Sequence, residues 1–465
     1  MSRLKPDPTF YPSPKMAMEA PQERHGYVAG LNYGRNGKPD TLLVVDLNEN
    51  SKTYGQILSQ TDMPYVGDEL HHFGWNACSS ALSPSAPHPH LARRYLIVPG
   101  MRSSRIYIFD TQPDPLHPKL VKTIEAEEVM TKTGYSRPHT AHCGPDAIYI
   151  NAMGSTNGKD GPGGIFMLDH FNFDVIGPWE IDRGDQDLAY DFWWHIAHDV
   201  MVTSEWAKPH QFEKGVVPED LLAGKYGHRL HFWDMRKQTR VQSVDLGADQ
   251  QMVLELRPAH DPRKTHGFAG VVVSLKDLSA NIWTWYRENG KWAAKKIITI
   301  PAQPANEDDL PPLLKGFKAV PPLVTDIDLS LDDRYLYVSC WGTGELHQYD
   351  VSDPFNAKLV GKIEIGGIVR QKGHPKHNGG LLGGPQMVEI SRDGKRVYLT
   401  NSLYSSWDDQ FYPDLLEGWM VRINAQPNGG MELDPNFFLQ TGELRLHQVR
   451  LEGGDASTDS YCYPS

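Results

Sequence analysis

The sequence has few cysteines, and none of them are close together. Its 465 residues contain four, Cys78, Cys143, Cys340 and Cys462, without any CxxC spacing. This spacing excludes both a disulfide framework and a zinc ribbon, which need several cysteines at short intervals. Scattered cysteines in a long chain are typical of a reducing compartment, so we expect a cytoplasmic protein.

Basic charge and long apolar segments are also lacking. The 46 Lys and Arg residues are outnumbered by 58 Asp and Glu residues, which gives a net charge of −12. Such a chain lacks the basic surface that supplies most of the affinity for nucleic acid. The longest apolar runs, such as residues 42–45, are far shorter than the roughly 20 residues that cross a bilayer. We therefore expect no nucleic-acid partner and no membrane span.

Several enzyme motifs are absent. The chain has no P-loop, no strand-linked GxGxxG, no GxSxG nucleophile elbow and no HExxH zinc motif. The glycine-rich residues 154–164 join two predicted strands without a following helix, so they form a loop and not a phosphate cradle. Nucleotide-dependent enzymes and serine hydrolases of these types are excluded.

Short predicted strands are abundant and occur in pairs. The 42 glycines and 35 prolines separate apolar runs that are short and rich in β-branched or aromatic residues, which predicts an all-β protein. Seven hairpins are predicted: 27–30 with 42–46, 95–98 with 105–110, 147–150 with 165–169, 200–203 with 230–234, 268–273 with 282–286, 334–338 with 346–350, and 396–399 with 419–424.

The hairpins recur about every 61 residues, a spacing that indicates a β-propeller with generous loops. Residues 326–337 and 387–398 align without a gap, and each contains an inner strand, a Ser-x-Asp turn and a second strand. Because a blade cannot bury both of its faces alone, the blades must close into a ring. The sequence predicts a seven-bladed β-propeller.

The two ends of the sequence complete each other. The first hairpin has no preceding inner strand, whereas residues 443–450 form an inner strand without a following hairpin. We expect the N- and C-terminal strands to pair and close the ring, with residues 1–20 as an extended, proline-rich, uncleaved lead-in and residues 21–465 as a single propeller domain. Two separate β domains are the alternative, but no long linker or charge run divides the chain.

Histidines occupy three of the seven positions expected to line the channel. The inner strands place His71 with His72, His139, Asp191, Glu255, Asp326, Gln386 with Glu389, and His447 around the axis. The three histidine positions are consecutive around the ring. Imidazoles without thiolates suit copper, zinc, iron or nickel better than magnesium or calcium. Two hypotheses stay open from the residues alone: a metal site, or hydrogen-bonded channel histidines.

Other candidates are less clearly placed. His142 follows His139 by three positions, so it reaches the same metal only if the strand bends there. Cys78 follows the histidine pair on the same inner segment, where an imidazolium or a metal would lower its pKa; the alternative is an inert, half-buried thiol. Cys143 ranks second, and Cys340 is expected in the core. Six other histidines are expected in turns or solvated loops: His88, His90, His198, His260, His374 and His377.

Nine segments resemble the selenium-binding protein family, whose members include the methanethiol oxidases. They are residues 68–80 (DELHHFGWNACSS), 103–107 (SSRIY), 139–143 (HTAHC), 190–193 (YDFW), 203–207 (TSEWA), 329–334 (LSLDDR), 383–387 (GGPQM), 402–415 (SLYSSWDDQFYPDL), and His447 with 453–455 (GGD). The segments occur in the order found in the family, and the resemblance covers about residues 20 to 460.

The resemblance implies a propeller fold and, for the oxidase members, copper-dependent oxidation of methanethiol by O2 and water. It supports copper ligation by His71, His72, His139 and His447, and it implies selenium or reactive-thiol chemistry at Cys78. Some relatives have a second cysteine where this chain has Ala81 and a tail cysteine where it has Ala456. We therefore expect neither a CxxC dithiol nor a redox-active tail cysteine. A non-enzymatic propeller that binds selenium or proteins is the rival function.

Overall fold

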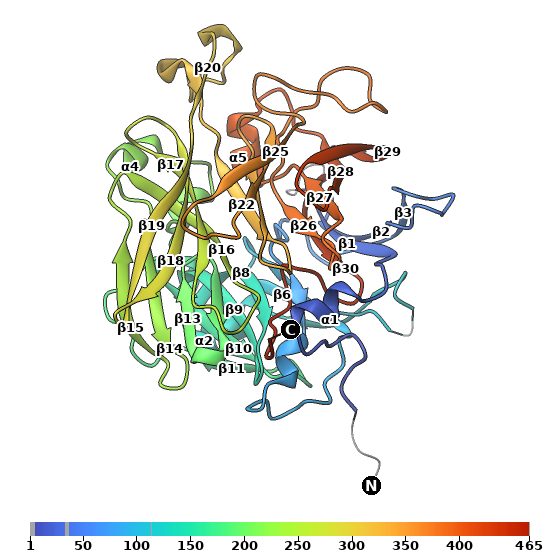
Figure 1. Ribbon diagram of the computed structural model, residues 1–465, viewed down its shortest axis with the longest axis vertical. Helices are drawn as coiled ribbons and strands as arrows, with labels where there is room; N and C mark the ends of the chain where they lie inside the picture. Colours follow the sequence, from blue (N-terminus) through green and yellow to red (C-terminus); the bar gives the residue numbers. More distant parts are fainter. Residues whose placement is uncertain (1–4, 33–36, 113, 465) are drawn as a thin grey trace.

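The protein is built from seven four-stranded antiparallel sheets arranged as a seven-bladed β-propeller. The computed structural model describes residues 5–32, 37–112 and 114–464. The sheets follow one another in sequence order, and the C-terminal strands, drawn in red, return to lie beside the N-terminal strands, drawn in blue (Figure 1). The fold class predicted from the 61-residue repeat is confirmed.

Each blade has an inner strand, a central hairpin and an outer strand. The first four blades, from the inside outwards, are β30 (Arg445–Leu451), β1 (His25–Leu31), β2 (Thr41–Asp46), β3 (Ile57–Asp62); β4 (Gly74–Trp75), β5 (Tyr95–Gly100), β6 (Arg105–Asp110), β7 (Lys119–Ile124); β8 (Tyr135–Cys143), β9 (Ile148–Ser155), β10 (Asp160–Leu168), β11 (Val175–Pro178); and β12 (Phe192–His195), β13 (Val200–Thr203), β14 (Arg229–Asp234), β15 (Thr239–Asp245). The other three are β16 (Gln250–Pro258), β17 (Gly267–Ser274), β18 (Ala280–Glu288), β19 (Lys291–Ile300); β22 (Val324–Leu329), β23 (Tyr335–Cys340), β24 (Glu345–Asp350), β25 (Lys358–Glu364); and β26 (Val388–Ile390), β27 (Arg396–Thr400), β28 (Gly418–Ala425), β29 (Met431–Gly442).

All seven predicted hairpins form the two central strands of a blade. The Ser-x-Asp turns are alike in two neighbouring blades: Ser330 Oγ donates to Asp332 at 2.6 Å, and Ser391 Oγ donates to Asp393 at 2.6 Å. A short side chain that bonds its own turn stabilises the reversal between two strands. The gapless alignment of these segments in the sequence thus corresponds to the same local structure.

The ring closes through the chain ends, as expected. β1 pairs antiparallel with β30, with Val28 opposite Val449 and Gly26 opposite Leu451. Every residue of β1 and β30 is buried, whereas the outer strand β3 is only half-buried. β1 therefore pairs on both of its edges and has no exposed edge that could recruit another chain.

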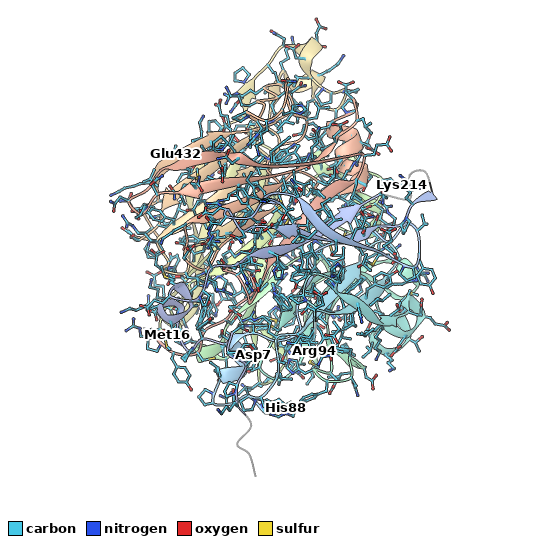
Figure 2. The ribbon with its side chains drawn as sticks, turned by 90° about the vertical axis from the view of Figure 1, so that its right-hand side faces the viewer. Asp7, Met16, His88, Arg94, Lys214 and Glu432 are labelled. Atoms are coloured by element: carbon cyan, nitrogen blue, oxygen red, sulfur yellow. The ribbon has the colours of Figure 1, made fainter. Side chains whose placement is uncertain are left out.

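The N-terminal segment and the C-terminal tail lie together at one end of the ring (Figure 1). Figure 2 shows Asp7 of the N-terminal segment at the same end as Arg94 and His88. Helix α1 (Pro14–Met18) interrupts the lead-in that was predicted to be extended, and residues 1–4 of that lead-in lie outside the described residues. The Tyr463 amide donates to Pro12 O at 3.1 Å, and the Arg93 amide donates to Asp7 Oδ2 at 3.0 Å. The division into a lead-in and one propeller domain stays a prediction.

Short helices and one small hairpin decorate the loops. The α-helices are α2 (Ala126–Thr133), α3 (Pro209–Phe212), α4 (Pro218–Leu222) and α5 (Ser405–Phe411); the 3-10 turns are η2 (Ser79–Leu82), η3 (Thr156–Gly158), η4 (Ile196–His198), η5 (Glu307–Asp309) and η6 (Lys315–Phe317). β20 (Gln303–Pro304) pairs with β21 (Ala319–Val320) in a projection at the edge of the molecule (Figure 1). None of the helices in the described part of the chain has the length and apolar character of a membrane span.

Candidate metal centre

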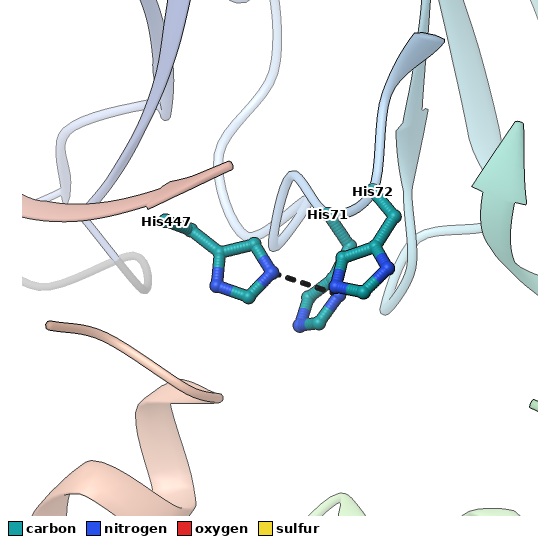
Figure 3. A group of neighbouring side chains, drawn as sticks. All are labelled: His71, His72 and His447. Carbon is teal, nitrogen blue, oxygen red and sulfur yellow. Dashed lines mark hydrogen bonds between the residues drawn. The ribbon is translucent and has the colours of Figure 1, made fainter. Parts of the chain in front are cut away.

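Four histidines from three neighbouring blades meet at the channel. His71 and His72 directly precede β4, His139 lies on β8 and His447 lies on β30, and all four are buried. One ring nitrogen from each of His71, His72 and His447 lies within 4.8 Å of the other two (Figure 3). The ring centroid of His139 lies 4.7 Å from that of His71 and 4.3 Å from that of His72. The inner strands thus bring these residues together despite their distance in sequence.

The hydrogen bonds of His71 and His447 show which ring nitrogens carry protons. His71 Nε2 lies 3.1 Å from Leu403 O, and His447 Nδ1 lies 2.6 Å from Ser402 O. Because a carbonyl oxygen only accepts, these two nitrogens must donate, and the other nitrogen of each neutral ring has a lone pair. Those two nitrogens, His71 Nδ1 and His447 Nε2, face each other at 3.1 Å (Figure 3). A cation between them would convert this unfavourable contact into coordination.

The rings of His72 and His139 are oriented like those of His71 and His447. Each has an Nε2 atom that is buried and has no hydrogen-bond partner among the described residues. The opposite nitrogens lie near oxygens: His139 Nδ1 is hydrogen-bonded to Thr140 Oγ1 at 2.7 Å, and His72 Nδ1 lies 3.5 Å from Glu255 Oε1. Metal-binding histidines are commonly oriented in this way, with one nitrogen on an oxygen and the other turned to the ion.

The electrostatics keep these rings neutral. Burial, followed by the neighbouring histidines, lowers the pKa values of His71 and His72 well below the ordinary histidine value. Burial and the nearby His447 do the same to the pKa of His139, and burial lowers the pKa of His447 to about 4. Neutral imidazoles have the lone pairs that a metal requires. The donor set therefore fits copper, zinc, iron or nickel.

An acidic arc faces the histidines, as the inner-strand positions predicted. Glu255, Asp326 and Asp328 are buried around Arg257, which contacts their carboxylates at 3.1, 3.3 and 3.3 Å. Asp191 Oδ2 lies 3.7 Å from the same guanidinium. One arginine thus compensates carboxylates from the inner segments of three blades, and Glu255 links this network to His72.

An aromatic cover lies next to the histidines and was not predicted as part of the site. Tyr190 contacts the His139 ring at 4.3 Å between centroids, and Tyr404 contacts the His71 ring at 6.0 Å. Trp206 packs on Tyr190 at 5.5 Å and on Trp407 at 5.3 Å. These four aromatic side chains belong to one buried apolar cluster, which borders the histidines on this side. Their only sequence signal is membership of motifs 190–193, 203–207 and 402–415.

His142 contacts a different set of residues. Its ring lies 4.0 Å from that of Trp193, and its Nε2 lies 3.5 Å from Asp191 Oδ1. Sequence spacing allowed His142 to join the metal only through a bend in the strand. The β8 register does shift between Pro138 and Ala141, yet the His142 ring contacts aromatic residues of β12.

The prediction that His374 lies in a solvated loop is wrong. His374 is buried: its ring stacks on Phe438 at 4.7 Å, and its Nε2 donates to Asp434 O at 3.0 Å. His260 lies at a turn, where its amide donates to Asp333 at 2.6 Å. Both residues have structural partners outside the cluster of four histidines.

Cys78 is buried in a pocket of other thiols and hydroxyls. Its Sγ lies 3.0 Å from Ser80 Oγ and 3.3 Å from Cys143 O. Burial and the charge of Asp459 favour the neutral thiol, but the Cys143 side chain, the Ser80 hydroxyl and the charge of Arg93 outweigh them, and the pKa of Cys78 is lowered. The cause that we expected, an imidazolium or a metal, is not among these contacts.

Comparison with known families and relatives gives one consistent answer. A family model described as 56kDa selenium binding protein (SBP56) matches residues 4–462. A methanethiol oxidase of Xenopus laevis is 40% identical over 478 residues, which cover 97% of each chain. Selenium-binding protein 2 of Mus musculus is 39% identical over 477 residues and also covers 97% of each chain.

Solved structures agree with this comparison. A crystal structure described as a hypothetical selenium-binding protein from Sulfolobus tokodaii is 60% identical, with a TM-score of 0.96, and covers 98% of this chain and 100% of that one. A periplasmic gluconolactonase of Pseudomonas aeruginosa, 12% identical with a TM-score of 0.55, covers 92% of this chain and 99% of its own. The second similarity concerns the fold alone.

Proposed function

The chain belongs to the 56 kDa selenium-binding protein family, and from this membership we propose that it is a copper-dependent methanethiol oxidase. The reaction converts one methanethiol, one O2 and one water to formaldehyde, hydrogen sulfide and hydrogen peroxide. Relatives that are about 40% identical along nearly the whole chain and are named methanethiol oxidase support the activity.

One observation carries the metal assignment: two neutral imidazoles face each other through unprotonated nitrogens 3.1 Å apart, while carbonyl oxygens hold their N–H groups. Two more buried imidazole nitrogens beside them have no partner among the described residues. We assign His71, His72, His139 and His447 as the ligands. Copper bound there would supply an affinity for the substrate sulfur and a change of oxidation state.

The surrounding residues orient these ligands and shape the site. Leu403 O, Ser402 O and Thr140 Oγ1 orient His71, His447 and His139 by hydrogen bonds, and Glu255 lies 3.5 Å from His72. The aromatic cover of Tyr190, Tyr404 and their neighbours gives this side of the cluster an apolar lining, which disfavours charged compounds. A small, uncharged thiol and O2 are compatible with such an apolar approach.

Cys78 is proposed as the residue that holds sulfur or selenium. Its lowered pKa increases the thiolate fraction, which is the nucleophilic form of cysteine. Its pocket is distinct from the histidine cluster: Cys143 lies four residues after His139 on the same strand, which corresponds to about 13 Å. We therefore assign sulfur handling to Cys78 and metal binding to the histidines.

Metal content and peroxide release test this function. The untagged protein is expected to bind copper stoichiometrically and to release hydrogen peroxide when methanethiol is added in air. His447→Ala should lose both copper and peroxide release, because it removes a ligand without touching the aromatic cover. His117→Ala is the matched control, since His117 is exposed and pairs only with Asp114 among the described residues.

The result can also favour the rival function. A folded His447→Ala variant with full peroxide release would refute the assigned ligands. A metal-free wild-type protein that carries selenium on Cys78 and releases no peroxide would favour a non-enzymatic selenium-binding propeller instead.

A further inference from the structure

Three of the four cysteines converge at one end of the channel. Cys78 Sγ donates to Cys143 O at 3.3 Å, and Cys143 Sγ lies 3.9 Å from Thr458 O in the C-terminal tail. The two side chains are near enough that each one shifts the pKa of the other. Cys462, in the C-terminal tail, places its Sγ 3.8 Å from Ser79 O and 3.9 Å from Ser80 O. These residues come from separate segments, so the sequence has no CxxC signal for them. The tail does bring a cysteine to this pocket, although position 456 is alanine.

The pocket also contains a buried cation. The Arg93 guanidinium bonds Asp459 at 2.8 and 2.9 Å through Nη2, and Asp459 accepts from the Ser79 amide at 3.3 Å. Arg93 Nη1 is buried without a hydrogen-bond partner among the described residues. A partly unsatisfied guanidinium beside a thiol stabilises the thiolate and an anionic leaving group.

The two neighbouring thiols differ in acidity. The pKa of Cys78 is lowered, as described above, whereas burial and the nearby Cys78 sulfur raise the pKa of Cys143 well above the ordinary thiol value. A more acidic thiol next to a less acidic one is the arrangement found where one cysteine is oxidised and a second cysteine resolves it.

We propose that Cys78 and Cys143 form a peroxide-reactive pair, in which hydrogen peroxide oxidises Cys78 and Cys143 closes a reversible disulfide. The peroxide source rests on the function proposed above, because methanethiol oxidation releases hydrogen peroxide inside the same protein. The pair itself rests only on the contacts between the two cysteines and on the surrounding Ser80 and Arg93.

The chemistry balances in two steps. The Cys78 thiolate attacks one peroxide oxygen, the O–O bond breaks, and hydroxide leaves, so that Cys78 becomes a sulfenic acid. The Cys143 sulfur then attacks the Cys78 sulfur, an S–S bond forms, and the S–O bond breaks as hydroxide takes up the thiol proton. In sum, two thiols lose two electrons, one peroxide gains them, and two water molecules form.

The proposed disulfide makes the protein sensitive to hydrogen peroxide, the product of its own reaction. While the disulfide exists, Cys78 has no free thiol and cannot hold sulfur or selenium. The same disulfide protects Cys78 from irreversible oxidation to sulfinic acid, and a thiol reductant restores it. Accumulated peroxide would therefore slow the protein reversibly.

The test adds peroxide directly to the full-length protein after a chelator has removed metal and without methanethiol, so that the outcome does not depend on turnover. Free thiols, titrated after denaturation, should fall from four to two, and peptide mapping should find a Cys78–Cys143 cross-link that dithiothreitol reverses. Cys143→Ser should give no cross-link, and its Cys78 should proceed to sulfinic acid, which dithiothreitol does not reverse. Cys340→Ser is the control, because Cys340 lies buried in β23 and should leave the cross-link intact.

Other results overturn the pair. A Cys78–Cys462 cross-link would show that the tail cysteine resolves Cys78, and equal oxidation of Cys78 and Cys340 would show that Cys78 is not selectively reactive. The wild-type cross-link is read without any variant, so an unfolded Cys143→Ser protein does not obscure the result. Peroxide release from methanethiol without a cross-link refutes only the thiol pair, and a cross-link without such release refutes only the oxidase function.

Discussion

Arg257 is the residue whose replacement should most severely disturb the channel. It is buried on β16 and contacts Glu255 on its own strand and Asp326 and Asp328 on the neighbouring inner strand β22. Asp191 approaches the same guanidinium from the preceding blade. Arg257→Met keeps much of the side-chain volume but removes the positive charge and all of its hydrogen bonds.

The expected loss follows from these contacts. Breaking one buried ion pair by removing a partner typically costs about 3–5 kcal/mol, since an uncompensated charge stays buried. Here several carboxylates share one guanidinium, and the variant avoids part of the cost by protonating some of them. We therefore expect Arg257→Met to lower the free energy of unfolding by about 3–5 kcal/mol at pH 8.

The loss should depend on pH in a defined direction. Burial already raises the pKa of Asp328 above its ordinary value, and Arg257 opposes that effect. Without Arg257 the folded-state pKa rises further, whereas the unfolded-state pKa stays near 4. A folded pKa above the unfolded one means that stability falls as pH rises between the two values. The variant should thus be closer to wild type at pH 5 than at pH 8.

Urea unfolding followed by tryptophan fluorescence at pH 5 and pH 8 measures this difference. Arg236→Met serves as the control, because the Arg236 side chain is 76% exposed and pairs with Asp199 at the surface. The control should stay within about 0.5 kcal/mol of wild type at both pH values. A loss below about 1 kcal/mol for Arg257→Met at pH 8, or the same loss at both pH values, would refute the reasoning.

Three further outcomes are expected elsewhere in the ring. Burial alone would raise the pKa of Glu345, but hydrogen bonds and basic neighbours lower it to about 2. Lowering the pH from 4.5 to 2 should therefore reduce the free energy of unfolding of the wild-type protein by up to about 3 kcal/mol, and that of Glu345→Gln by much less. Gly366→Ala should lower the free energy of unfolding by more than about 3 kcal/mol, because the added Cβ would lie 1.7 Å from a backbone oxygen. Gly394→Ala is the control and should cost about 1 kcal/mol in thermal or urea unfolding, because Gly394 also has a positive φ but no described atom within 4 Å of the added Cβ. Removing residues 443–465 deletes β30 and frees an edge of β1, so size-exclusion chromatography should find aggregates that the wild-type protein does not form.

The hairpins and the ring closure were predictable because each depends on local signals. A strand of period two followed by turn residues identifies a hairpin, and the equal spacing of seven hairpins identifies the repeat. The inner strand predicted at residues 443–450 had no hairpin after it, and the N-terminal hairpin had no inner strand before it, so the two were expected to pair. The channel positions of His71, His72, His139 and His447 followed from the repeat, because matching positions of neighbouring blades meet at the axis.

The thiol pocket and the aromatic cover could not be predicted in the same way. Cys78 meets Cys143 across 65 residues, and Arg93 meets Asp459 across 366 residues, through loops and a tail that do not follow the repeat. His374 was placed wrongly for a related reason: its glycine-rich loop resembles a solvated segment, but Phe438 of β29 covers it. Contacts between loops depend on how far each loop folds back, and residue patterns carry little information about that.

One continuous segment connects the closure of the ring with both sites. β30 pairs with β1, carries His447 into the histidine cluster, and continues into the tail that places Asp459 on Ser79 and Cys462 beside the Cys78 pocket. Until β30 docks, the cluster lacks His447 and the thiol pocket lacks its cover. A ligand that binds only the assembled cluster must stabilise the docked strand by mass action. Metal binding, protection of Cys78 and ring closure are therefore expected to be thermodynamically linked, although the two sites share no residue.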